Sequence, residues 1–144
     1  MSKYLVGKTI TQIKIADDKK AILFITDCGD VIARTDGDCC SDSWIEHIGL
    51  PALGFPAKVI DVCDLDYGPE NNYLVVQGYT VPGARLKHYG CKITTDRGEI
   101  FIDYRNESNG YYYGDLCWPD EGFYGGVQGQ NVSTEQWVEV DGDV

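Results

Sequence analysis

Short apolar runs that alternate with polar residues and stop at turn residues constrain the fold of this chain most strongly. In the N-terminal stretch GKTITQIKIADDKKAILFITDCGDVIARTDGD, Ile10, Ile13 and Ile15 lie among Thr, Gln and Lys in a pattern close to a period of two. That pattern is typical of a half-buried strand. Polar turns at residues 17–20 and 27–30 separate it from two further strands, so the stretch predicts an antiparallel meander.

Apolar runs of the same kind continue to residue 117, and Asn109-Gly110 is a strong signal for a hairpin turn. These runs predict strands at residues 58–65, 73–81, 85–95, 99–104 and 111–117. Residues 41–43 are good helix caps, and residues 44–48 predict one short helix that Gly49 ends. We therefore expect a mainly β fold with a minor α part: a single antiparallel sheet, strongly bent or barrel-like, with one short helix. No internal repeat is visible in the sequence.

One domain accounts for a chain of 144 residues. Residues 1–118 predict a β-rich globular domain. Residues 119–144 are rich in Gly, contain six acidic residues and no Lys or Arg, and are expected to pack on the same domain. The chain has no apolar run long enough to span a membrane and no secretory signal pattern, so we expect a cytoplasmic protein.

The formal net charge of −11 disfavours direct binding of nucleic acid, because such binding needs Lys and Arg to replace counterions. An acidic surface keeps a small protein soluble, and it also attracts a partner with a basic groove. Six cysteines without a Cys-x-x-Cys pair predict reduced thiols, several of them packed as small apolar residues. They are Cys28, Cys39, Cys40, Cys63, Cys91 and Cys117.

The Tyr-rich hairpin near residue 110 is the main candidate for a binding surface. Its aromatic rings, amides and guanidinium group suit docking on a protein or stacking on a base. The competing interpretation is cross-strand packing, in which one face of the hairpin belongs to the core. The candidate residues are Tyr104, Arg105, Asn106, Ser108, Asn109, Tyr111, Tyr112, Tyr113 and Trp118.

A second candidate group is Asp38, Cys39, Cys40, Trp44 and His47. Cys40 and His47 could form a nucleophile and its base, but the sequence offers no group to orient the base and no oxyanion site. The spacing also lacks the paired ligands of a zinc site, and the Gly-rich stretch GGVQGQN lacks the Lys of a phosphate loop. We therefore expect no catalysis, no metal and no cofactor, with packing as the role of the two cysteines.

The pattern LVGKTI…DCC…WIEHI…KITTDRGE…IDYRNESNGYYYGDL…WP resembles an uncharacterised family of small proteins in tailed-phage genomes and prophages, classed as a DUF7448-type domain. The resemblance extends from Leu5 to about Trp118. It implies a phage accessory protein that acts in the cytoplasm of the bacterial host. Proteins of that kind often bind and neutralise a host factor, including defence systems.

Three functional hypotheses follow, and the first is a non-enzymatic phage protein that binds and inhibits a bacterial host protein through its acidic, Tyr-rich surface. Trp118 or Trp137 would be additional anchors. The second is a sponge for a small nucleotide signal, with the tyrosines on the base and Arg85, Arg97 or Arg105 on phosphate. The third is a hydrolase that uses Cys40. Arginines clustered beside the tyrosines would favour the sponge, and scattered arginines would favour the inhibitor. The sequence leaves a homo-oligomer open.

Overall fold

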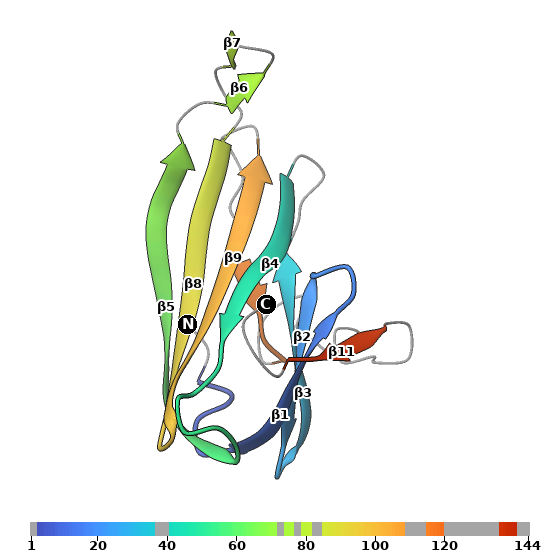
Figure 1. The fold of residues 1–144 in the computed structure, drawn as a ribbon, viewed down its shortest axis with the longest axis vertical. Helices are drawn as coiled ribbons and strands as arrows, with labels where there is room; N and C mark the ends of the chain where they lie inside the picture. The colour runs from blue at the N-terminus through green and yellow to red at the C-terminus, as the bar shows by residue number, and fades with distance from the viewer. Residues whose placement is uncertain are drawn as a thin grey trace.

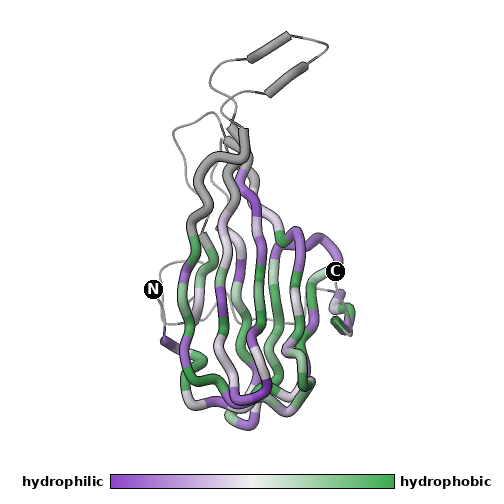
Figure 2. Tube along the Cα trace, turned by 60° about the vertical axis from the view of Figure 1, so that its left-hand side comes forward, coloured by the Kyte–Doolittle hydropathy of each residue, from purple (hydrophilic) through white to green (hydrophobic). Residues whose placement is uncertain are grey.

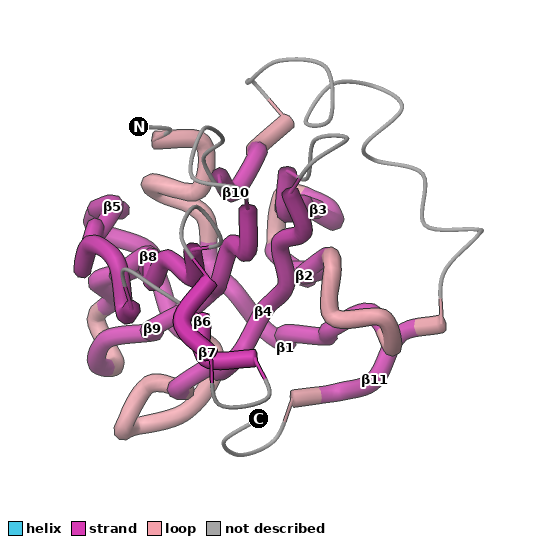
Figure 3. Tube along the Cα trace, turned by 90° about the horizontal axis from the view of Figure 1, so that it is seen from above, coloured by secondary structure: helices cyan, strands magenta, loops and turns pink. Residues whose placement is uncertain are grey.

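The computed structural model describes residues 3–36, 41–71, 74–76, 79–81, 85–108, 115–119 and 136–140. This part of the chain consists of eleven strands joined by turns and loops, without a helix (Figure 3). The strands are β1 (Thr9–Ala16), β2 (Ala21–Thr26), β3 (Gly29–Asp36), β4 (Ser41–Gly49), β5 (Ala57–Asn71), β6 (Leu74–Val76), β7 (Tyr79–Val81), β8 (Arg85–Thr95), β9 (Gly98–Ser108), β10 (Asp115–Cys117) and β11 (Trp137–Glu139).

Nine of these strands form one antiparallel sheet in the order β10-β3-β2-β1-β5-β8-β9-β4, with β11 added beside β1. The long strands β5, β8, β9 and β4 lie side by side, and β1, β2 and β3 form the other part (Figure 1). Only Thr9 and Ile10 of β1 pair with β5. The sheet bends sharply at this short junction. It also stays open, because its end strands β10 and β4 do not pair with each other. The predicted mainly β fold with one bent antiparallel sheet is confirmed.

The predicted helix at residues 44–48 is wrong, because this segment is part of β4 and pairs with β9. A β-bulge lies between Ile45 and His47, so that Glu46 is an extra residue in the strand. The bulge lets Ile45 and Ile48 both reach the core although they are three residues apart. Spacing by three is the signature of a helix face, and the bulge imitates it.

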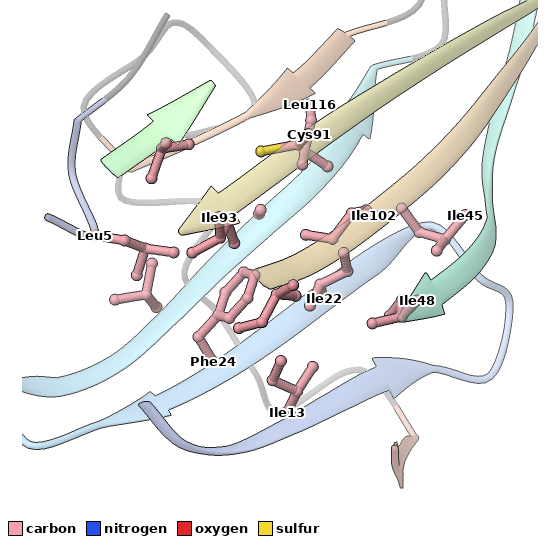
Figure 4. Close-up of a cluster of buried hydrophobic side chains, with 14 of the residues drawn as sticks. Leu5, Ile13, Ile22, Phe24, Ile45, Ile48, Cys91, Ile93, Ile102 and Leu116 are labelled. Carbon is pink, nitrogen blue, oxygen red and sulfur yellow. The ribbon is translucent and has the colours of Figure 1, made fainter. Parts of the chain in front are cut away.

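The core lies between the two parts of the bent sheet. Side chains of β1 and β2, such as Ile13, Ile22 and Phe24, point toward side chains of β4, β8 and β9 (Figure 4). Phe24 also stacks on Trp118, with ring centroids 5.6 Å apart. Hydrophobic and hydrophilic residues alternate along the strands in Figure 2, as expected when one face of each strand is buried.

The two parts of the sheet contain an internal repeat that the sequence did not reveal. In β1–β2, the opposite pairs are Ile10↔Thr26, Gln12↔Ile25 and Ile13↔Phe24. In β5–β8, they are Val59↔Thr95, Asp61↔Thr94 and Val62↔Ile93. The two units of the repeat are β1-β2-β3 and β5-β8-β9. In each unit, the pairing skips one residue at the same place in the first strand, so the two units have the same register.

The hairpin turns of the two units also match, in the segments TDCG and TDRG. In the first, the Thr26 hydroxyl donates to the Gly29 carbonyl oxygen at 2.6 Å, and Thr95 does the same to Gly98 at 2.6 Å. The Asp that follows each Thr accepts a hydrogen bond from a backbone N–H of the unit's first strand. The repeat is therefore one of backbone geometry and turn chemistry, with little identity along the strands.

The two units meet at equivalent residues. Thr9 lies opposite Lys58, and these residues hold the same place in β1 and β5, since each N–H donates to the Asp of its own unit's turn. Ile10 lies opposite Ala57, and the Val59 N–H donates to the Lys8 carbonyl oxygen at 2.9 Å. The contact that the first unit makes with the second is therefore also made by the second with the first, as in an arrangement with two-fold symmetry. We therefore treat β1 and β5 as equivalent strands.

Candidate functional site

Strands β4 and β9 bring together the two groups of candidate residues, which are far apart in the sequence. Their register places Ser43 opposite Asn106 and Trp44 opposite Arg105. Beyond the bulge, His47 lies opposite Asp103. One member of each of the first two pairs comes from the Tyr-rich hairpin and the other from β4, so antiparallel pairing alone creates this assembly.

The inward face of this strand pair is core. Tyr104 is 3% exposed and stacks on Tyr89, with ring centroids 5.5 Å apart and an interplanar angle of 17°. Asn106 is fully buried, and its Nδ2 donates to Ser43 Oγ at 2.8 Å. Trp118 is likewise buried against Phe24. Tyr104, Asn106 and Trp118 therefore contribute to packing in this structure, as the cross-strand interpretation of the hairpin expected for one face.

The outward face of the same pair carries the accessible candidates. Along β9, the buried residues alternate with Phe101, Asp103 and Arg105, and Phe101 is 38% exposed. On β4, the half-buried Trp44 lies opposite Arg105, and its indole N–H donates to Glu46 Oε2 at 2.8 Å. We define Trp44, Glu46, His47, Phe101, Asp103 and Arg105 as the outer β4–β9 face.

Sequence reasoning missed three members of the outer β4–β9 face: Glu46, Phe101 and Asp103. The last two follow from the alternation of residues 100–106, which leaves every second side chain on the surface. Glu46 has no comparable signal, because its role depends on the bulge and on its bond to Trp44.

The remaining candidates are placed only in part. Ser108 pairs with Ser41 at the end of β9. Residues 109–114, with Asn109, Tyr111, Tyr112 and Tyr113, lie outside the described residues, and so do Asp38, Cys39 and Cys40. Of the acidic C-terminal segment, Trp137–Glu139 pairs with β1 as β11.

The described cysteines are free thiols, of which Cys28 is exposed and Cys91 and Cys117 are buried. Burial raises the pKa of the Cys91 thiol well above its ordinary value, and the charge of Asp64 adds to this effect. Cys91 is therefore a poor nucleophile and acts as a small apolar residue. Within the described ranges, no three His, Cys, Asp or Glu side chains gather as metal ligands. In the same ranges, no helix could span a membrane.

The three arginines that could hold phosphate do not all lie together. Arg85 lies opposite Ser108, near the same end of the β8–β9 pair as Arg105. Arg97 lies in the turn before β9, whereas Arg105 lies near the other end of that strand. A strand rises about 3.3 Å per residue, so the backbones of these two arginines are about 25 Å apart. They cannot grip the same small phosphate group.

The sequence matches a known family model. The model described as "Domain of unknown function (DUF7448)" matches residues 3–118, which include strands β1 to β10. No curated protein and no solved structure matches the chain. The matched range covers most of the 144 residues, and the chain therefore belongs to the DUF7448 family.

Proposed function

We propose that this protein is a non-enzymatic bacteriophage accessory protein that binds and inhibits a protein of the bacterial host, in the host cytoplasm. The observation that carries the binding role is the outer β4–β9 face. The phage setting, and inhibition of a host or defence-system protein as the outcome, rest on the resemblance of the sequence to small proteins of tailed phages and prophages.

The composition of the outer β4–β9 face supports docking on a protein. Trp and Arg are the residue types that most often dominate binding energy, and here Trp44 and Arg105 are cross-strand neighbours. Phe101 adds exposed apolar area on the same strand as Arg105. A cluster of this kind offers one partner both an apolar contact and a charged hydrogen-bond donor.

The placement of these anchors on paired strands also supports the proposal. Trp44 is half-buried and held by Glu46, so it loses little freedom when a partner binds. The net charge of −11 would draw a basic partner toward the molecule and raise the association rate at low salt.

The positions of Arg97, Arg105 and Tyr104 support a protein partner more than a nucleotide. Arg97 and Arg105 are about 25 Å apart by the rise of a strand. Tyr104 is buried, so its ring has no free face for a base. The Cys40 hydrolase hypothesis gains no support from the described residues, among which Cys40 is not included.

Capture from a bacterial host with matched variants tests the proposed function. Tagged wild-type protein, Trp44→Ala, Arg105→Ala and the control Ile60→Ala would be purified from a bacterial host and measured by native mass spectrometry. Ile60 is 57% exposed on β5, away from the outer β4–β9 face, so its truncation removes apolar surface elsewhere. Circular dichroism would establish that each variant is folded.

We expect one bacterial protein to remain with the wild type and with Ile60→Ala, and to be lost with Trp44→Ala and Arg105→Ala. With purified components, each of the two variants should weaken binding at least about tenfold, the effect of a central anchor. Higher salt should slow association. Equal capture by all four proteins would overturn the proposed face. Added mass of a few hundred daltons in place of a protein would favour the nucleotide sponge.

A further inference from the structure

The outer edge of β1 shows how this fold accepts an additional strand. β11 pairs with β1 through Lys14↔Glu139, Ile15↔Val138 and Ala16↔Trp137. Next to this ladder, the Val140 N–H donates to the Ile13 carbonyl oxygen at 2.9 Å. The edge of β1 beyond its junction with β5 is thereby covered by the C-terminal part of the chain (Figure 1).

The equivalent edge of β5 has a different cover. Val62 takes the place of Ile13 in the repeat, and its carbonyl oxygen accepts a hydrogen bond from Lys3 Nζ at 3.0 Å. The Lys3 ammonium also binds the Asp61 carboxylate and holds the pKa of that group below its ordinary range. Among the described strands, only β1 pairs with this edge, as far as Lys58, and backbone hydrogen bonds with Gly7 and Lys8 extend the cover to Val59.

We propose that the outer edge of β5, at residues 61–65, is a docking site for a basic, extended segment of a protein partner. The segment would add to the sheet as β11 adds to β1. Its backbone would form the hydrogen bonds that fix its position, and Lys or Arg side chains would provide selectivity, as in other complexes formed by strand addition.

Charge identifies the class of occupant. In the occupied edge, Lys14 of β1 lies opposite Glu139 of β11, so the added strand carries the complementary charge. The β5 edge instead presents Asp61 and Asp64, both exposed, one on each face of the sheet, so a basic side chain of the added strand can meet an acid on either face. Lys3 already places an ammonium group on Asp61 and on a backbone acceptor of this edge. A basic partner would reproduce and extend that contact.

A second copy of this chain fits the same edge poorly. Two β5 strands in antiparallel pairing would bring either Asp61 or Asp64 of one copy opposite the same acid of the other, depending on the register. Like charges that face each other across a strand pair are destabilising. Charged side chains on an edge strand also discourage pairing between copies.

Strand addition at β5 is separate from the proposed function, which depends on side chains of the outer β4–β9 face. In the order β5-β8-β9-β4, β5 and β4 are the two outer strands, on opposite sides. The two proposals can fail separately. A test with a synthetic peptide needs no host protein, so its result does not depend on whether the proposed inhibitor role is correct.

The test uses a six-residue peptide of alternating Val and Lys, with blocked ends, and a second peptide of the same sequence with a methyl group on every backbone nitrogen. Both carry the same charge, but the methylated peptide cannot donate the ladder hydrogen bonds. Binding would be measured by calorimetry, and the contact would be mapped by amide hydrogen exchange. Variants Lys3→Ala and Lys58→Ala remove one positive charge each, and only Lys3 covers Val62.

We expect the unmethylated peptide to bind at least tenfold more tightly than the methylated one and to slow exchange at residues 61–65. Lys3→Ala should raise its affinity several-fold more than Lys58→Ala, because Lys3→Ala also uncovers the Val62 carbonyl oxygen. Equal binding of both peptides, protection elsewhere, or equal effects of the two variants would overturn the proposal. So would a dimer of the free chain with residues 61–65 protected, which would make a second copy the occupant.

Discussion

The carboxylate of Asp27 connects the β2–β3 turn to strand β1 by a hydrogen bond. Its Oδ1 accepts the Thr9 N–H at 2.9 Å, and this bond lowers the pKa of Asp27 below its ordinary value of 3.8. A carboxyl whose pKa is lower in the folded state stabilises the protein above its unfolded-state pKa. That contribution is lost as the pH falls through the folded-state pKa. Asp27→Asn should therefore reduce the free energy of unfolding near pH 7, and the difference from wild type should shrink below about pH 4.

Urea denaturation at a series of pH values measures this difference. Asp30→Asn is the matched control, because it removes the same charge from the same hairpin without touching the Thr9 bond. A difference between wild type and Asp27→Asn that stays constant from pH 7 to pH 3 would contradict the assigned role of the carboxylate.

At the scale of the element, the two repeated hairpins provide a pair of matched glycines. Gly29 has φ +105° and Gly98 has φ +119°, a region that residues with a Cβ atom rarely adopt. An added Cβ would meet open space at Gly29, whereas at Gly98 it would lie 2.9 Å from the backbone nitrogen of Ala52. Each Ala substitution should lower the free energy of unfolding by about 1–3 kcal/mol. Gly98→Ala should cost about 1–3 kcal/mol more.

Guanidinium denaturation of the two variants, compared with wild type, measures these costs. The turns are equivalent, so the backbone strain cancels and the excess reports the contact with Ala52. Equal losses would mean that the loop at residues 51–54 moves away without cost, and that it does not fix the end of β9.

Most of the strands and turns could be predicted from the sequence because each depends on residues close together in the chain. The predicted strand at residues 73–81 is an exception, since it is two short strands, β6 and β7, that pair with each other. The alternation around Ile13 and the polar turn at residues 27–30 are local signals, and both are correct. Two features depend on distant residues and were missed. The bulge at Glu46 gives β4 the spacing of a helix, and only its pairing with β9 makes the segment a strand. The register that joins Trp44 to Arg105 has no local signal at all.

At the scale of the whole molecule, β1 and β5 each have an equivalent edge beyond their short junction, and the two edges are protected in different ways. The β1 edge is covered by β11, and the buried Val140 follows it into the core. The β5 edge carries acidic side chains and the Lys3 contact. An edge can be kept from pairing with other copies either by a cover or by charge. Removing each protection should therefore have a different consequence.

A chain that ends at residue 135 should lose the cover of β1. Loss of the Val140 side chain from the core should lower the free energy of unfolding by about 1.5–3 kcal/mol. The uncovered edge has the single charge of Lys14 among apolar neighbours, so we expect the shortened chain to self-associate at micromolar concentrations. Lys3→Ala should remain monomeric, because the acids of β5 repel a second copy. A chain that ends at Val140 is the control, since it keeps β11 and its bond to Ile13. Sedimentation velocity separates these outcomes. A shortened chain that stays monomeric would contradict the role of β11 in protecting the β1 edge. A Lys3→Ala dimer would contradict the role of the acidic side chains in protecting the β5 edge.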